Sequence, residues 1–88
     1  MKSEAKISVV EVMGSIEKGP EKRIEVRLME YNGRRYLDLR TFEKKGEKWV
    51  FTQKGITLGA RSFNDFVNIL TGKQEIIDLA LNAEVPDA

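Results

Sequence analysis

The stretch IEVRLMEYNGRRYLDLRTF, residues 24–42, decides the fold, because Asn32-Gly33 divides it into two runs of alternating apolar and polar residues. Asn-Gly between two such runs is typical of a two-residue β-hairpin turn, since both turn positions need a positive φ. A turn of this length also sets the register of the two strands. The predicted cross-strand pairs are Tyr31–Arg34, Met29–Tyr36, Arg27–Asp38 and Glu25–Arg40.

Successive side chains of a strand point to opposite faces, so this register sorts the hairpin into two sides. One side, the aliphatic face, carries Ile24, Val26, Leu28, Leu37 and Leu39. The other, the cationic–aromatic face, carries Arg27, Tyr31, Arg34, Tyr36, Arg40 and Phe42. Cross-strand aromatic pairs contribute about 0.2–1 kcal/mol to a hairpin, which explains Tyr36 alone as well as binding does. The full set favours binding of single-stranded nucleic acid, in which bases stack on rings and phosphates meet cations.

The length is that of one small domain, residues 1–88, whose core as a monomer is expected to be thin. The net charge of +1 conceals an asymmetry. Residues 1–60 hold 13 Lys and Arg against 9 Asp and Glu, a balance of +4, whereas residues 61–88 hold 2 against 5, a balance of −3. Taken alone, these charges fit an ordinary solvated surface better than a binding site, although the field over one face matters more than the total.

The sequence holds no constellation typical of an enzyme. It has neither cysteine nor histidine, which excludes a disulfide framework, thiol–metal sites, the common zinc sites and imidazole catalysis. Asp38 and Glu25 face arginines in the predicted register and are interpreted as ion pairs. Lys54-Gly55 lacks the upstream glycine of a phosphate-binding loop. We therefore expect no catalytic residue, no metal, no cofactor and no small-molecule substrate.

Membrane and export signals are also missing from the sequence. No apolar run reaches the roughly 18 residues of a membrane span, and Met1-Lys2-Ser3-Glu4 begins no signal-peptide core. We expect no membrane partner and a cytoplasmic location, associated with the nucleoid if the protein is bacterial.

Two further strands are expected around the hairpin. A β-rich run at residues 7–16 ends at a turn over 17–21. A polar loop at 43–47 precedes a fourth strand, opened by 49–52. The two aliphatic residues of 56–58 fall on one side of this strand and are expected to face the core.

A helix is expected to begin at Ser62, with Asp65 completing a capping box and favouring the positive end of the helix dipole. Apolar residues then recur at helical spacing as Phe63, Phe66, Val67 and Leu70. Thr71-Gly72 is expected to weaken or kink the helix before the pattern resumes.

The order of these elements predicts an α+β fold, a four-stranded antiparallel β-meander followed by one C-terminal helix. Ile69, Ile76 and Ala80 lie beside the main apolar stripe of the helix. A helix this broadly apolar in a small domain needs a second buried surface. We expect a homodimer packed through the helices, with residues 7–82 as the core of the domain and 83–88 as a flexible tail.

The same residues resemble a known family, the positive-cofactor-four transcriptional coactivators, in their single-stranded-DNA-binding domain. Three segments are similar in the expected order, IEVRLMEYNGRRYLDLRTF (24–42), QKGITL (53–58) and SFNDFVNIL (62–70), and together they span about half of the chain. The family has small bacterial relatives. The resemblance implies a curved four-stranded sheet plus a helix, dimerised through the helices, that binds melted or single-stranded DNA on the sheet.

The resemblance also assigns roles by position. Tyr31 matches an aromatic at the hairpin tip that stacks on bases, and Arg34 matches a basic tip residue. Arg40 matches the arginine after the aliphatic-Asp-aliphatic step, and Lys54 the lysine before the glycine.

The chain departs from the family at two positions. Glu43 stands where members often have an aromatic residue, and Asn32 where they often have a basic one. Stacking is then expected to shift to Phe42 or to Trp49. The sequence leaves Trp49 open as either a stacking platform or a core residue.

We therefore expect a non-enzymatic homodimer that binds single-stranded DNA with little sequence specificity, in transcription regulation or another process that uses melted DNA. The expected phosphate contacts are Arg27, Arg34, Arg40 and Lys54, with Lys44 or Lys45, and the expected stacking residues are Tyr31, Tyr36 and Phe42. Two alternatives stay open: an RNA-binding protein of the same fold, and a protein-interaction module that uses the helix or a sheet edge.

Overall fold

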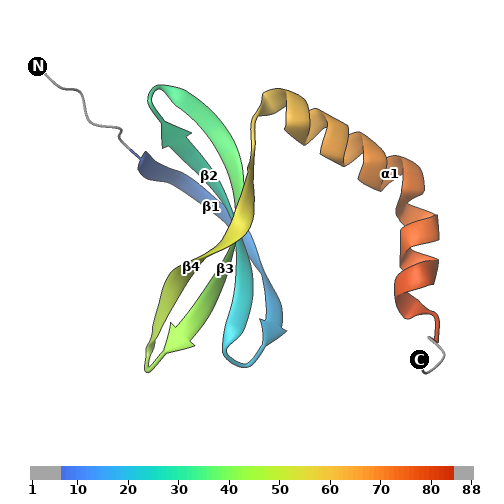
Figure 1. Cartoon of the computed structure of the whole chain (residues 1–88), viewed down its shortest axis with the longest axis horizontal. Coiled ribbons are helices and arrows are strands. Elements are labelled where there is room, and N and C mark those ends of the chain that lie inside the picture. The colour runs from blue at the N-terminus through green and yellow to red at the C-terminus, as the bar shows by residue number, and fades with distance from the viewer. Residues whose placement is uncertain (1–6, 85–88) are drawn as a thin grey trace, which may run out of the picture.

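The computed structural model describes residues 7–84 as four strands followed by one helix (Figure 1). The elements are β1 (Ile7–Gly19), β2 (Lys22–Tyr31), β3 (Arg34–Lys45), β4 (Lys48–Leu58) and α1 (Ala60–Asn82). The strands form one open, curved antiparallel sheet in the order β1-β2-β3-β4. The predicted α+β meander with a C-terminal helix is confirmed. Of the expected tail, residues 85–88 lie outside the described residues.

The central hairpin folds as its sequence predicts. Asn32 and Gly33 both have positive φ, 53° and 81°, as a two-residue turn requires. All four predicted cross-strand pairs are present in the β2–β3 register. Since the register is the predicted one, the assignment of side chains to the two faces is confirmed as well.

Two strands, β1 and β3, extend further than expected. β1 continues to Gly19, so the turn predicted over 17–21 is reduced to Pro20 and Glu21. β3 continues to Lys45, because a two-residue turn at Gly46-Glu47 lets 43–45 pair with β4. The polar loop predicted at 43–47 is therefore mostly strand. Gly46 has φ 65°, which explains a glycine at this turn.

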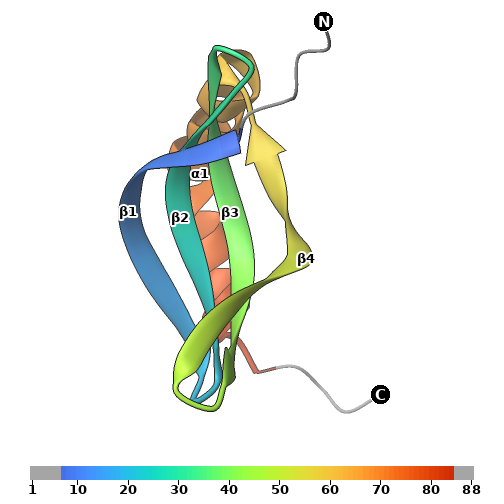
Figure 2. The same cartoon turned by 90° about the vertical axis from the view of Figure 1, so that its left-hand side faces the viewer.

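Irregular pairing shapes both edges of the sheet. Between the pairs Arg40–Gly55 and Phe42–Phe51, β3 has only Thr41 whereas β4 has residues 52–54. Figure 2 shows β4 bowing away from β3 at this bulge. Just beyond it the two strands come very close, since a Cβ at Gly55 would overlap the carbonyl oxygen of Leu39. Bulges increase local twist, which accounts for the curvature.

The helix begins earlier than predicted. Gly59 is the N-cap, no side chain caps the helix, and the backbone N–H of Phe63 donates to the Gly59 carbonyl at 2.8 Å. The predicted start at Ser62 with an Asp65 capping box is wrong, because this bond already closes the first turn around Ser62. α1 continues through Thr71-Gly72, although Figure 1 shows its axis changing direction about half-way.

The packing within one chain is sparse on the helix side. Leu28, Leu37 and Leu58 share a shallow hollow with Ala60 and Phe63 at the start of α1, and from there the helix leads away from the sheet (Figure 1). The aliphatic face therefore turns toward the helix. Within residues 7–84, no helix is long and apolar enough to span a bilayer.

Much of this apolar surface is open in the single chain. Ile56 lies on the aliphatic side of β4, as predicted, yet is 53% exposed. On α1, Ile69, Ile76 and Leu79 are 60%, 63% and 72% exposed.

Candidate nucleic-acid interface

The face of the sheet turned away from α1 brings most of the predicted site residues together. Their positions follow from strand pairing, in which Arg27, Tyr31, Arg34, Tyr36, Arg40 and Phe42 alternate with the aliphatic residues of β2 and β3. Pairing between β3 and β4 adds residues of β4 to this face, because Trp49 pairs with Lys44, Phe51 with Phe42 and Thr57 with Asp38. Lys54 lies in the β4 bulge.

A buried carboxylate holds two of the arginines. The Arg27 guanidinium donates from Nη2 to Asp38 Oδ2 at 2.9 Å, and Arg40 donates from Nη2 to Oδ1 at 2.7 Å. Thr57 Oγ1 donates to Oδ1 at 3.2 Å. The Asp38 side chain is only 4% exposed, against 13% for Arg27 and 21% for Arg40. The ion pair predicted between Arg27 and Asp38 is confirmed.

The surroundings of Asp38 determine its charge. Burial by itself raises the pKa of this carboxyl, but the hydrogen bonds and charges of Arg40 and Arg27 outweigh burial and hold the pKa below its ordinary 3.8. Asp38 is therefore ionised at neutral pH. The cluster of Arg27, Arg40 and Asp38 carries a formal charge of +1 rather than +2.

Glu25 has a different partner from the one that the register predicts. Arg40 lies opposite Glu25 but donates to Asp38, whereas Arg23, two residues along β2, donates from Nη2 to Glu25 Oε2 at 2.6 Å. The expected Glu25–Arg40 ion pair is wrong, because the Arg40 side chain turns along its own strand. Arg40 Nη1 also donates to the Gln53 carbonyl at 3.3 Å.

The aromatic residues of this face differ sharply in exposure. Tyr31 is 39% exposed at the hairpin tip, and Tyr36 is half-buried. Phe42 is only 8% exposed, because the Arg27 guanidinium lies 5.1 Å from its ring centroid and the Phe51 ring 6.4 Å away. The expectation of Phe42 as an exposed ring is therefore wrong.

Phe51 is the functional candidate that the sequence reasoning missed. It is 63% exposed and pairs with Phe42 on the same face. The Gly46 turn could have revealed it, since a two-residue turn there sets the register of β4 on β3 and places Trp49 and Phe51 together. Trp49, left open by the sequence, lies half-buried on this face with the Arg23 guanidinium 4.3 Å from its ring centroid.

Other cations on or beside this face are not neutralised. Arg34 and Lys54 are exposed, and neither forms an ion pair within residues 7–84. Lys54 is positioned by its bulge, where Thr52 Oγ1 accepts its backbone N–H at 3.1 Å. Exposed Lys44 lies at the far end of the same face, whereas Lys45 lies 3.7 Å from Glu43.

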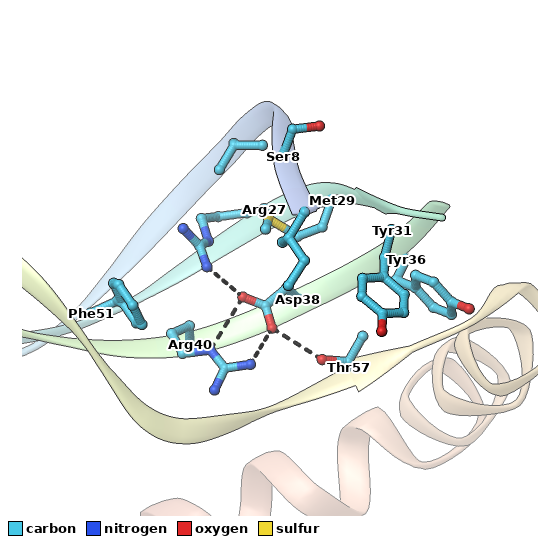
Figure 3. A pocket seen from close by; sticks show the side chains of 11 residues that line it. Ser8, Arg27, Met29, Tyr31, Tyr36, Asp38, Arg40, Phe51 and Thr57 are labelled. Atoms are coloured by element: carbon cyan, nitrogen blue, oxygen red, sulfur yellow. Dashed lines mark hydrogen bonds and ion pairs between the residues drawn. The ribbon is translucent and has the colours of Figure 1, made fainter. Parts of the chain in front are cut away.

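An open cavity of about 710 Å³ lies over the Asp38 cluster (Figure 3). Its lining combines polar residues from the centre of the sheet with apolar and aromatic residues from all four strands. In the part of the chain that the structure describes, no three Asp, Glu, His or Cys side chains gather as metal ligands would. The cationic–aromatic face can therefore bind flat rings and anions on one surface.

Comparison with known proteins gives one family. Residues 16–69, more than half of the chain, match the model described as Transcriptional Coactivator p15 (PC4). No curated protein matches the chain in sequence.

Two solved structures are similar, the orthorhombic and tetragonal crystal forms of BPSL1147, a PC4 homolog from Burkholderia pseudomallei. The orthorhombic form has a TM-score of 0.65 at 23% identity, over 73% of this chain and 88% of that chain. The tetragonal form has a TM-score of 0.64 at 23% identity, over 73% of this chain and 96% of that chain. At this identity the likeness shows a shared fold.

Proposed function

The chain belongs to the PC4 family of transcriptional coactivators, and we propose that it binds single-stranded DNA on its cationic–aromatic face. The observation that carries the proposal is the exposure of Tyr31 and Phe51 on the same face as Arg34, with Lys54 exposed in the β4 bulge. Rings in the open bind unstacked bases, and cations without an ion-pair partner bind phosphates. A duplex hides the flat faces of its bases, so this surface favours single strands.

Different residues of this face bind the bases and the phosphates. Bases stack on Tyr31, Phe51 and the open side of Tyr36, while Phe42 supports Arg27 and Phe51 from within. Phosphates bind Arg34, Lys54 and Lys44. Arg27 and Arg40 together contribute one net positive charge, because Asp38 neutralises the other.

Trp49 completes the set of rings at the far end of the sheet. Its ring lies beside Arg23, and a base that stacks there meets both a π-face and a guanidinium. Stacking accepts any base, so we propose loose sequence preference and a role in transcription regulation or another process that uses melted DNA. The protein acts without enzymatic chemistry.

We propose that the binding unit is a homodimer packed through α1 and the aliphatic face. The chain exposes 7664 Å², where a compact monomer of its mass exposes about 5200 Å². Its radius of gyration is 16.5 Å, against about 12 Å for a compact domain of this length. A second copy supplies the apolar surface that both the helix and the aliphatic face need.

Salt dependence tests the proposal. A fluorescent oligothymidine is titrated with protein at several salt concentrations, with a blunt duplex of matched length as control. Each neutralised phosphate adds about −0.7 to the slope of log K against log salt, so four to six contacts give a slope of roughly −3 to −4. A flat response, or tighter binding to the duplex, would contradict the proposal. A matched RNA oligomer as competitor separates DNA from RNA binding.

A further inference from the structure

The first half of β1 lies outside the segment that matches the family. The match begins at residue 16, whereas β1 begins at Ile7. Pairing with β2 places Ile7 opposite Tyr31 and Val9 opposite Met29, so this half of β1 adds apolar side chains to the cationic–aromatic face. Figure 2 shows the start of β1 crossing in front of β2. β1 therefore adds a wall at one end of the face.

This wall completes the cavity of about 710 Å³ over the Asp38 cluster (Figure 3). The volume lies within the range of about 300–1,000 Å³ that small-molecule sites have. Its sides are mostly apolar or aromatic and its floor is polar. The sides carry Ile7, Val9, Met29, Tyr31, Tyr36 and Phe51, with the small polar Ser8, and the floor carries Arg27, Asp38, Arg40 and Thr57. A nucleobase has the same division, because its two flat faces are apolar and its edge is polar.

The floor of the cavity offers hydrogen-bond donors. Asp38 Oδ1 accepts from Arg40 and Thr57, and Oδ2 accepts from Arg27 and Arg40, so both carboxylate oxygens are occupied. Arg27 uses only Nη2, and its Nε is buried without a partner in the described chain. Donors remain on the Arg27 guanidinium, and no carboxylate lone pair is left to accept a base amino group.

We propose that this cavity takes one base of the bound strand and favours guanine there. The inference rests on the proposed function, because the base arrives as part of the strand. Guanine presents two adjacent acceptors, O6 and N7, which arginine reads more often than any other base edge. Adenine has an amino donor beside both N7 and N1, so on either edge this donor would face the donors of Arg27. Cytosine has two adjacent acceptors, O2 and N3, and is the base expected to compete with guanine. A phosphate does not suit the site, since the sides formed by Ile7, Val9 and Met29 would strip its water without replacing those hydrogen bonds.

The test compares short fluorescent oligothymidines in which one central thymine is replaced by guanine, adenine or cytosine. We expect the single guanine to tighten binding about tenfold, the order that one arginine–guanine pair gives. Adenine gives no gain, and cytosine gives a smaller gain than guanine. Replacement of guanine by 7-deazaguanine, which lacks the N7 acceptor, removes most of the gain and needs no change to the protein.

Paired variants locate the site. Val9→Trp fills the cavity, whereas Val10→Trp places the same ring at the neighbouring position, which does not line the cavity. We expect the guanine-to-thymine affinity ratio to fall to about one in Val9→Trp and to stay near tenfold in Val10→Trp. Equal affinity for all four bases, a gain that survives 7-deazaguanine, or a ratio unchanged in Val9→Trp would overturn the inference while leaving the proposed function intact. Failure to bind any oligomer would instead contradict the proposed function itself.

Discussion

The two faces of the sheet differ in burial, and the polar face is the more buried of the two. Within residues 7–84, the buried residues are Glu25, Asp38 and Phe42, and all three lie on the cationic–aromatic face. On the opposite face the aliphatic residues of β2 and β3 are only half-buried, and Ile56 of β4 is 53% exposed. In an ordinary monomeric domain the apolar face would be the covered one.

The difference shows which face one chain can complete alone. On the cationic–aromatic face, arginine stems and rings cover one another, and Asp38 satisfies two guanidinium groups at 2.7 and 2.9 Å. The aliphatic face has no such internal partner, because α1 leads away from it after its first turn (Figure 1). A charged surface can be completed by its own long side chains, whereas an apolar one needs another layer.

The largest effect should come from the apolar side. Replacing Ile69 and Ile76 together with glutamate should abolish the proposed dimer, giving a monomer or an unfolded chain, because two charges would enter the surface between the helices. Analytical ultracentrifugation with far-UV circular dichroism measures both outcomes. Asn68→Glu adds the same charge at an exposed polar position about 100° around the helix from Ile69; it is the control and should leave assembly unchanged. A wild-type protein that sediments as a stable monomer at micromolar concentration would contradict the claim that the aliphatic face needs a second copy to cover it.

Removing the charge that organises the other face should cost less. Asp38→Asn leaves two partly buried arginines facing a neutral amide and should lower the free energy of unfolding by about 3 kcal/mol at pH 7. Chemical denaturation of wild type and variant measures the difference. Glu30→Gln is the matched control, because its partner Arg35 is 64% exposed, and it should cost less than about 1 kcal/mol.

The same variant predicts a pH dependence. The pKa of Asp38 in the folded chain lies below its ordinary 3.8, so its contribution is fully present above pH 3.8 and is lost as the pH falls through the lower, folded-state value. The difference in stability between wild type and Asp38→Asn should therefore shrink only in strong acid. If the stability difference already shrinks between pH 7 and pH 5, its pH dependence comes from a titrating group other than Asp38.

The two neighbouring phenylalanines should separate stability from binding. Phe42→Ala removes the buried ring and should cost about 3 kcal/mol of folding stability. Phe51→Ala, at a ring that is 63% exposed, should change stability by about 0.5 kcal/mol or less but weaken binding to oligothymidine by about 1–3 kcal/mol. Thermal denaturation and fluorescence anisotropy give the two readouts. Equal effects of both variants on binding would show that exposure does not decide which ring stacks.

A similarly small change in folding is expected at the hairpin tip. Tyr31 is 39% exposed beside a turn, so Tyr31→Ala should leave stability within about 0.5 kcal/mol. Its loss of single-strand affinity should be about 1–3 kcal/mol if the ring stacks on a base. Tyr31→Phe keeps the ring and serves as the control. Wild-type binding by Tyr31→Ala would move the stacking role away from the tip.

Much of the fold could be predicted from local sequence. Asn32-Gly33 needs only its own backbone angles to set the β2–β3 register, and period-two alternation then sorts the side chains onto two faces. The helix and its apolar stripe follow from spacing in the same way. The start of α1 was misplaced by two residues, because the hydrogen bond from Phe63 to Gly59 requires no capping side chain.

The site could be predicted only as far as its side of the sheet. Alternation placed Phe42 and Arg40 on the correct face but gave no measure of what covers them. Phe51 was missed because β4 takes its register up to Phe51 from the two-residue turn at Gly46-Glu47, and the bulge beside Thr41 then shifts the register of the rest of the strand. These features act between strands, and no single strand reveals them.

By itself, therefore, the sequence determined the hairpin, the order of the elements and the chemical character of each face, because all of these depend on backbone preferences and on residue spacing within one segment. The tertiary structure decided that Phe42 is covered while Phe51 is open, that Arg40 turns from Glu25 to Asp38, and that the start of β1 encloses a cavity. Each of these depends on how twist and bulges bring side chains of different strands together, and such distances are set by the whole sheet.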